Sequence, residues 1–306
     1  MRPKKLSRKP IPVILDTDIG GDIDDTWAVA MMLKSPELDV RLVVSDTCNS
    51  EYRAKILAKL LEVAGRTDIP VGVGVWQDSD VQGQEPWVRD YDLRTYPGTV
   101  YQDGVEAIIR TIRESAEPVT LICIGPMPNL RLALSKAPDI AAKTRFVGMH
   151  GSIARQHDGK EGAIAEYNVV WDVPACMKAF RAPWKEAIIT PLDTCGRIRL
   201  KGAKYQKIRK CRDPLVKAVI ENYDLWRRGR PDNGMSSILY DTVAIHLAFS
   251  TEFLEMRKMK LAVDGQGYTR QDPNGRPFQV AIDWNDLEGY EDFLVERLFA
   301  PTVRPA

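Results

Sequence analysis

The sequence lacks the features that mark several classes of protein. Its 306 residues carry a formal net charge of +1, which gives no electrostatic reason to expect binding to nucleic acid or to an anionic membrane. No segment reaches the length of a membrane-spanning helix. The five cysteines form no Cys-x-x-Cys pair, so neither a disulfide framework nor a zinc site is expected. A reducing cytoplasm is therefore the default setting.

Basic residues crowd the first ten positions, where Pro3 and Pro10 interrupt them. This stretch has no apolar core of the kind a secretory signal needs. We expect residues 1–10 to be a disordered, solvated tail, and residues 11–306 to form one domain. With 44% hydrophobic residues, the chain can bury a substantial core.

Strand-like apolar runs alternate with helical patterns along the chain. Strands are predicted at Ile11–Leu15, Val40–Ser45, Ile69–Gly74, Val119–Ile124, Arg145–Met149 and Glu186–Thr190. Helices are predicted from about Asp24 and at Glu51–Ala64, Gly104–Ser115, Leu130–Leu134, Pro174–Phe180 and through most of Ala203–Phe253. The alternation predicts an α/β fold with a mostly parallel, open sheet flanked by helices on both faces. A small C-terminal hairpin is expected around the turn Asp272–Gly275.

Five aspartates follow the first predicted strand within ten residues: Asp16, Asp18, Asp22, Asp24 and Asp25. Like charges this close repel each other, so a fold would avoid the arrangement without a compensating cation. Several carboxylate oxygens that converge on one point suit a hard cation such as Ca²⁺ or Mg²⁺.

Three alternatives to a metal site fit the aspartate cluster less well. An EF-hand loop would need Glu where Trp27 stands, and a helix rather than a strand before it. Helix capping accounts for one or two acids, not five. A phosphatase with an aspartate nucleophile would need a Thr-rich turn and a downstream Lys and acidic pair, which we do not find. The cluster therefore predicts a metal site.

Polar or turn-forming residues follow four further predicted strands, at Ser45–Asn49, Gly125–Asn129, His150–Ser152 and Pro191–Thr194. In open α/β sheets, ligands bind beyond the carboxyl ends of the strands. We therefore expect these segments and the aspartates to meet at one edge of the sheet.

Two further sets of polar residues fit a metal and sugar site. Glu166 and Asn168 would point to one face if their segment is extended, and a carboxylate beside an amide suits the recognition of hydroxyl groups. A solvated strand end is the alternative. Asp241 precedes an apolar helix, so it is either a helix N-cap or a second, distant carboxylate for the metal.

These motifs together carry a resemblance to a known family. The segment Asp16–Asp25 resembles the N-terminal signature of the inosine-uridine-preferring nucleoside hydrolase family, in a longer form with two residues inserted before the final Asp pair. Further segments that resemble the family in the same order are Gly125–Asn129, Ala165–Asn168 with Asp172–Ala175, Pro191–Thr194 and Asp241. Together they span residues 11 to about 250.

The resemblance implies a Ca²⁺ site with Asp18, Asp25, Asp241 and the backbone carbonyl of Pro128 as ligands. The family has Thr in place of Pro128, but a carbonyl ligand survives the change because proline lacks only the N–H. Asp18 would also be the general base. The resemblance further implies an enzyme that often forms homo-oligomers, a dimer or a tetramer.

The resemblance also assigns the ribose contacts. Asp24 would hold the 2′-hydroxyl, and Glu166 and Asn168 the 5′ and 3′ side of the sugar. Asp46 or Asn49 lies where the family has a sugar-contacting Asn.

The sequence departs from the family at the leaving-group acid, because Tyr240 stands where good inosine hydrolases have His. Phenols, with a pKa of about 10, are weak proton donors at neutral pH. Three alternatives stay open: a tuned Tyr240, a contribution from His157 in the loop Gln156–Lys160, or a substrate whose leaving group needs little protonation. Trp226 could stack on a base or anchor its helix.

The expected function is the Ca²⁺-dependent hydrolysis of the N-glycosidic bond of ribonucleosides, releasing base and ribose. One alternative is a homologue that binds the ribose or nucleoside but has lost turnover, since Tyr240 replaces the usual acid. A second is a metal-dependent phosphohydrolase.

Overall fold

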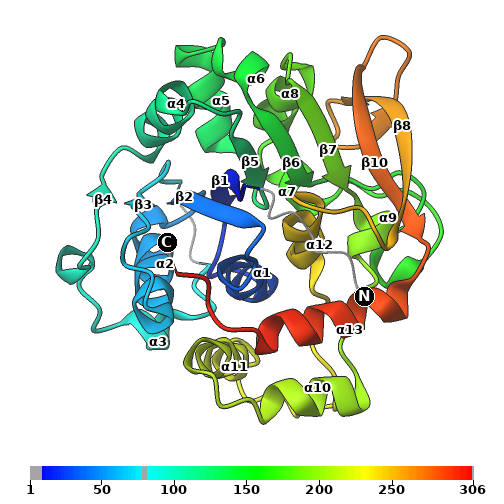
Figure 1. The fold of residues 1–306 in the computed structure, drawn as a ribbon. Coiled ribbons are helices and arrows are strands. Elements are labelled where there is room, and N and C mark those ends of the chain that lie inside the picture. The colour runs from blue at the N-terminus through cyan, green and yellow to red at the C-terminus, as the bar shows by residue number, and fades with distance from the viewer. Residues whose placement is uncertain (1–8, 78–80, 305–306) are drawn as a thin grey trace, which may run out of the picture.

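The structure is a computed structural model that describes residues 9–77 and 81–304. Residues 1–8 of the predicted basic tail lie outside this range. Within it, ten strands form one sheet in the order β4-β3-β2-β1-β5-β6-β7-β10-β8-β9 (Figure 1). The strands are β1 Ile11–Thr17, β2 Leu38–Ser45, β3 Val71–Gly72, β4 Val100–Tyr101, β5 Thr120–Cys123, β6 Arg145–Met149, β7 Glu186–Thr190, β8 Leu254–Val263, β9 Thr269–Gln271 and β10 Arg276–Trp284.

Neighbouring strands from β4 through β7 to β10 are parallel, and only β8 makes antiparallel pairs, with β10 and β9. The predicted class, a mostly parallel sheet covered by helices, is confirmed. The helices are α1 Asp24–Leu33, α2 Ser50–Ala64, α3 Glu85–Val88, α4 Gly104–Glu114, α5 Pro128–Lys136, α6 Ile140–Lys143, α7 Tyr167–Trp171, α8 Val173–Arg181, α9 Leu192–Cys195, α10 Gly202–Arg209, α11 Pro214–Trp226, α12 Tyr240–Leu247 and α13 Leu287–Phe299. Two 3-10 turns lie at Leu93–Thr95 and His157–Gly159.

Two apolar cores lie on opposite faces of the sheet, because successive side chains of a strand point to opposite sides. Val13 and Leu15 of β1 pack in one core with α1, α2 and α9 to α13. Ile14, between them, packs in the other core with α4, α5, α6 and α8. Figure 1 shows these two helical layers on either side of the sheet. The central strands are therefore buried on both faces, as their near-continuous apolar sequence predicts.

The C-terminal hairpin forms at a different turn from the predicted one. The segment Asp272–Gly275 joins β9 to β10, but these strands do not pair with each other. They flank β8 instead, where Leu261 pairs with Gln271 on one side and with Arg276 on the other. The hairpin is that of β8 and β9, closed by a hydrogen bond from the Asp264 N–H to the Tyr268 carbonyl (2.9 Å). The long strand β8 offers two edges, and the turn residues alone do not show which edge each neighbour takes.

The register of the sheet brings the strand ends to one level. Thr17 of β1 lies opposite Ser45 of β2, and Asp16 lies opposite Cys123 of β5. Met149 of β6 lies opposite Thr190 of β7. The loops that follow these strands therefore leave the sheet along one edge, as expected from the rule that ligands bind there.

Candidate active site

The aspartate loop joins β1 to α1 and is fixed by its own contacts. Thr17 donates its hydroxyl to a carboxylate oxygen of Asp25. Gly20 has φ +100°, and a Cβ there would lie 2.8 Å from the Tyr52 ring. The Tyr52 hydroxyl donates to the Gly20 carbonyl (3.1 Å) and accepts from the Gln84 N–H (2.8 Å). Glycine is thus required at the bend, and the loop is held against α2.

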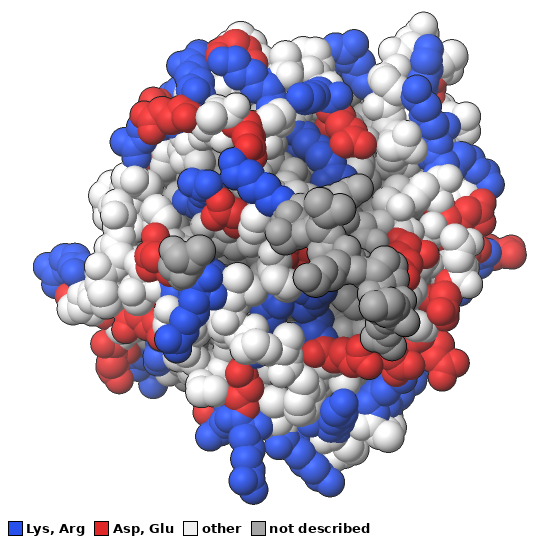
Figure 2. Space-filling view, in the orientation of Figure 1, with Lys and Arg blue, Asp and Glu red and all other residues white. Residues whose placement is uncertain are grey.

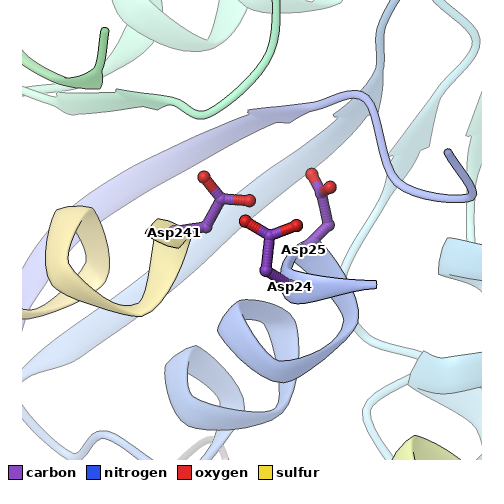
Figure 3. A group of neighbouring side chains, drawn as sticks. All are labelled: Asp24, Asp25 and Asp241. Atoms are coloured by element: carbon purple, nitrogen blue, oxygen red, sulfur yellow. The ribbon is translucent and has the colours of Figure 1, made fainter. Parts of the chain in front are cut away.

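Asp24, Asp25 and Asp241 form the tightest acidic group in the described residues. Each offers a carboxylate oxygen, and these oxygens all lie within 4.8 Å of one another (Figure 3). Asp24 and Asp25 begin α1, whereas Asp241 lies in the first turn of α12, which packs against α1. Asp24 and Asp25 therefore meet Asp241, which lies more than 200 positions further along the sequence.

The electrostatics of this group suit a bound cation. All three carboxyl groups are buried, and burial together with the neighbouring aspartates raises the pKa of each well above its usual range. Crowded buried carboxylates must bind either protons or a positive ion. Only oxygen donors converge here, so the group fits a hard divalent cation.

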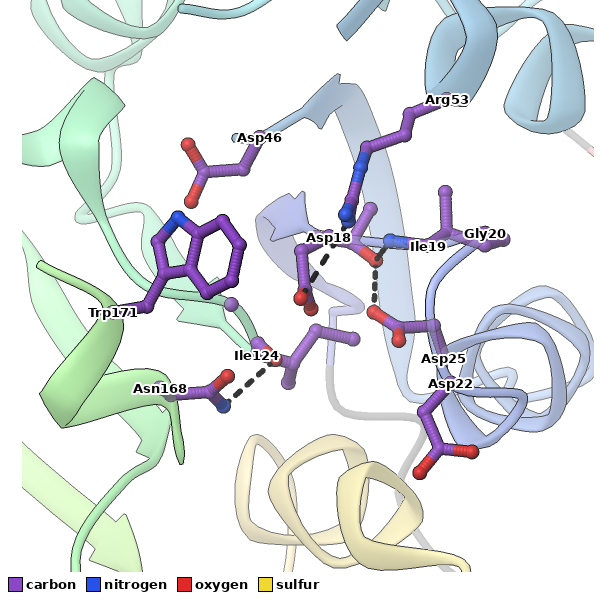
Figure 4. Close-up of polar contacts among 12 residues, drawn as sticks. Asp18, Ile19, Gly20, Asp22, Asp25, Asp46, Arg53, Ile124, Asn168 and Trp171 are labelled. Carbon is purple, nitrogen blue, oxygen red and sulfur yellow. Dashed lines mark hydrogen bonds and ion pairs between the residues drawn. The ribbon is translucent and has the colours of Figure 1, made fainter. Parts of the chain in front are cut away.

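Asp18 lies beside this group and faces a cation of the protein itself. One of its carboxylate oxygens is 3.5 Å from Nη1 of Arg53, which comes from α2 (Figure 4). Burial raises the pKa of Asp18, and the Arg53 charge opposes that rise. The expected metal ligands Asp18, Asp25 and Asp241 therefore lie in one region, and Asp24, expected to hold the sugar, lies among them.

A cavity of about 470 Å³ opens in front of the aspartates. It includes nine of the predicted site residues: Asp18, Asp24, Asp25, His157, Glu166, Asn168, Trp226, Tyr240 and Asp241. Gly21, Asp22, Val81, Ile124, Met149, Tyr167 and Leu192 complete the lining. Its volume is within the usual range for small-molecule sites.

Glu166 and Asn168 reach the cavity from a helix end, so the condition of an extended segment is not met. Glu166 caps α7 and accepts hydrogen bonds from the N–H groups of Asn168 (2.8 Å) and Gly151 (3.0 Å). Burial nevertheless raises the pKa of Glu166 to about 7. The Asn168 amide donates to the carbonyls of Ile124 and Met149, each at 3.1 Å. Cap geometry, rather than strand alternation, places both side chains on the same side.

Three predicted residues do not line the cavity. Pro128 begins α5, and Asn49 caps α2 by accepting a hydrogen bond from the Tyr52 N–H (2.9 Å). Asp46 is buried behind the site and accepts from the Met127 N–H (2.9 Å). Ile124, which directly follows β5 and precedes the predicted Gly125–Asn129 turn, does line the cavity. Sequence reasoning missed it, although its position at a strand end was the available signal.

Tyr240 and His157, the two residues considered as sources of the proton for the leaving base, contact each other. The Tyr240 hydroxyl lies 2.9 Å from Nδ1 of His157, and both residues line the cavity. Burial, and next the nearby Asp24, raise the pKa of Tyr240. The phenol is therefore not tuned to be more acidic, and the imidazole is its hydrogen-bonding partner.

Trp226, at the end of α11, also lines the cavity. Its ring stacks on Tyr223 with centroids 5.9 Å apart, and the guanidinium of Arg230 lies 4.6 Å from its centroid. Asp22, another member of the aspartate cluster, also lines the cavity and points away from Asp18 (Figure 4).

Comparison with known proteins identifies the family. The family model for inosine-uridine preferring nucleoside hydrolase matches residues 13–289. The chain therefore belongs to this family and is an N-glycosidase that hydrolyses ribonucleosides.

Relatives match the chain over nearly its whole length. The pyrimidine-specific ribonucleoside hydrolase RihA of Escherichia coli O7:K1 is 26% identical over 94% of this chain and 98% of its own. RihA of Salmonella typhimurium is 27% identical over the same shares. Among solved structures, the plant nucleoside hydrolase PpNRh1 has a TM-score of 0.78 at 23% identity, covering 96% of this chain and 100% of that one. The purine-preferring ribonucleoside hydrolase from Gardnerella vaginalis has a TM-score of 0.76 at 20% identity, with the same coverage.

No helix within residues 9–77 and 81–304 is long and apolar enough to cross a membrane. On the face shown in Figure 2, acidic and basic side chains are interspersed over the part of the surface that is coloured by charge.

Proposed function

We propose that the protein hydrolyses the N-glycosidic bond of ribonucleosides in a Ca²⁺-dependent reaction that releases base and ribose. The observation that carries the proposal is the meeting of Asp24, Asp25 and Asp241 within 4.8 Å, in a cavity that Asp18 also lines. The family membership supplies the reaction class, and the oxygen-only donors favour a hard cation over a transition metal.

The residues that would hold Ca²⁺ are Asp18, Asp25 and Asp241, with a backbone carbonyl. We place that carbonyl at Ile124 instead of Pro128, because Ile124 lines the cavity. When bound, the ion would lower the pKa of a water molecule and orient the ribose diol. Asp24 lies close enough to Asp25 and Asp241 to contact either the ion or the ribose diol.

The protein groups then have distinct tasks at the sugar. Asp18 accepts the proton of the attacking water as general base. Asp24 accepts a hydrogen bond from the 2′-hydroxyl, and Glu166 and Asn168 bind the 5′ and 3′ side. As the bond to the base breaks, positive charge develops on the ribosyl ring. The surrounding carboxylates stabilise that charge, so the crowding that is costly for the fold favours the transition state.

The hydrogen-bonded pair Tyr240–His157 would protonate the departing base. Tyr240 passes its hydroxyl proton to a ring nitrogen of the base. His157 supplies its Nδ1 proton to the phenolic oxygen across the 2.9 Å contact and takes up a proton from water at Nε2. In this arrangement both Tyr240 and His157 take part in protonating the base, whereas the sequence left them as separate alternatives. Trp226 would offer its ring to the base.

The test is turnover of a nucleoside panel with and without Ca²⁺. We expect chelation to abolish hydrolysis and Ca²⁺ to restore it. Asp18→Asn should remove turnover and weaken Ca²⁺ binding, whereas Asp172→Asn, outside the cavity, should alter neither. A fully active, Ca²⁺-replete Asp18→Asn enzyme would refute the assignment.

A binding homologue without turnover is the second candidate, supported by the raised pKa of the Tyr240 phenol. It predicts that ribose or nucleoside binds while no riboside is cleaved, including p-nitrophenyl riboside. Cleavage of any member of the panel excludes it. The family match leaves no support for the phosphohydrolase alternative.

We further propose that the enzyme acts in nucleoside salvage in the cytoplasm, as a homo-oligomer. The five cysteines are free and buried, which suits a reducing compartment. Size-exclusion chromatography with light scattering tests the oligomeric state.

A further inference from the structure

Arg53 places a buried positive charge directly behind the proposed general base. Its side chain is 1% exposed, and it lies in the first turn of α2 rather than in the cavity lining. In Figure 4 the guanidinium extends from α2 toward Asp18, and the two charged groups are 3.5 Å apart. Arg53 can therefore influence the reaction only through the residues it touches.

The hydrogen-bonding state of Arg53 is unusual for a buried arginine. Its Nε and Nη1 groups have no hydrogen-bond partner among the residues that the structure describes. Burying a charge is costly unless opposite charges surround it. Here the compensation comes from the carboxylate of Asp18, one oxygen of which lies 3.5 Å from Nη1. The guanidinium is thus paired by charge with the aspartate loop rather than by a fork of hydrogen bonds.

The position of Arg53 is fixed by its neighbours on α2. Asn49 caps this helix, and Tyr52, the residue before Arg53, joins it to the Gly20 bend. Gly21 lies so close that a Cβ there would be 3.6 Å from Nη2 of Arg53. The charge is held in one place by the same contacts that shape the aspartate loop.

We propose that Arg53 is a built-in counter-cation of the metal site and a positioning residue for Asp18. It stabilises the clustered carboxylates before a metal binds, and it holds one oxygen of Asp18 away from the metal so that this oxygen stays available as a base. A divalent ion entering the site meets a like charge, so Arg53 weakens metal binding while it supports turnover. The inference rests on the proposed function for the role of Asp18.

The proposal predicts opposite changes in two measurable quantities. In Arg53→Gln, Ca²⁺ should bind about tenfold more tightly to the metal-free full-length protein, measured by titration calorimetry, because a repulsive unit charge is removed. At saturating Ca²⁺, kcat should fall at least about tenfold with little change in KM, because Asp18 loses its orientation. Arg53→Lys keeps the charge, so its Ca²⁺ affinity should stay within about twofold of wild type while kcat recovers only in part.

Arg131→Gln is the matched control, because Arg131 also lies 3.5 Å from an aspartate, Asp172, but away from the cavity. It should change neither Ca²⁺ affinity nor kcat. Equal or weaker Ca²⁺ binding by Arg53→Gln overturns the inference, as does the absence of Ca²⁺ binding in every variant. If Arg53→Gln does not fold, Arg53→Lys decides the question. Tighter Ca²⁺ binding by Arg53→Lys than by wild type overturns the inference, whereas wild-type Ca²⁺ affinity with a reduced kcat supports it.

The Ca²⁺ affinities measured by calorimetry distinguish this inference from the proposed function. If no riboside is cleaved but Arg53→Gln still binds Ca²⁺ more tightly, the proposed function fails and the counter-cation survives. If hydrolysis depends on Ca²⁺ but the affinity order is not observed, only the role of Arg53 fails.

Discussion

Replacing His157 by Ala tests how the leaving base acquires its proton. The imidazole is the hydrogen-bonding partner of the Tyr240 hydroxyl at 2.9 Å, and burial of the phenol already raises its pKa. Without the imidazole, the phenol must give up a proton that no neighbouring group replaces. General acids contribute about 10² to 10⁴ in rate, or roughly 3 to 5 kcal/mol of barrier. We expect kcat for uridine and inosine to fall at least about 100-fold.

The same substitution should scarcely affect a substrate whose leaving group departs as an anion. With p-nitrophenyl riboside we expect a loss of less than about threefold, since nitrophenolate needs no proton. His157 is exposed in its 3-10 turn, and exposed substitutions usually change stability by no more than about 0.5 kcal/mol. Thermal unfolding should therefore be unchanged, which separates a chemical loss from a folding defect.

The control is Glu161→Gln, an exposed change in the same loop that leaves Tyr240 and His157 in contact. It should behave as wild type with both classes of substrate. Tyr240→Phe should repeat the pattern of His157→Ala, and the double variant should lose little more than either single one, because the two residues act as a unit. Equal losses with nucleosides and with p-nitrophenyl riboside would refute the acid role, and so would nucleoside turnover at the wild-type rate.

Other predictions concern the acidic residues of the cavity and Trp226. The pKa of Glu166 rises from 4.5 to about 7 on folding, so the folded state binds more protons between these values and loses stability as pH rises through them. The metal-free protein should thus unfold at a lower temperature at pH 8 than at pH 5, measured by calorimetry; the opposite slope contradicts the burial argument. Asp241→Asn should abolish Ca²⁺ binding yet raise the unfolding temperature of the metal-free protein, because it removes one of three mutually repelling carboxylates; unchanged Ca²⁺ affinity by titration counts against the site. Trp226→Ala should raise KM for nucleosides about tenfold by loss of stacking, with kcat nearly constant in steady-state kinetics; an unchanged KM would make Trp226 a helix anchor.

The strands of the central sheet were predictable because each is marked by a short apolar run in the sequence. β6 and β7 have the predicted bounds, and β1, β2 and β5 differ from prediction only at their ends. The short parallel strand β4, Val100–Tyr101, was not predicted. The predicted strand Ile69–Gly74 shrinks most, to Val71–Gly72, where the pairing with β2 covers only two residues. Since parallel strands end at one edge, the position of the aspartate loop beside the other strand ends followed from strand order along the chain.

Contacts that depend on tertiary packing were not predictable. The pair Tyr240–His157 joins residues 83 positions apart, and no periodicity links them. Arg53 lies in an ordinary amphipathic helix, where a basic residue suggests a solvated face, yet its side chain is buried against Asp18. That Ile124 lines the cavity was not predictable, because no side-chain type in the sequence marks which residue the path of the backbone brings to a cavity.

The cavity is lined by two groups of residues with different chemistry, and this division decides what a substitution can change. In the first group, carboxylates from α1 and α12 and the cap of α7 surround the proposed ribose position, and each is buried. A change there alters metal binding, sugar binding and the fold together. In the second group, Trp226 and His157 lie on a helix end and an exposed turn. Their replacement leaves the carboxylates in place, so the choice of base can vary while the ribose chemistry stays fixed. Tyr240 connects the two groups, because it neighbours Asp241 along the chain and His157 in space.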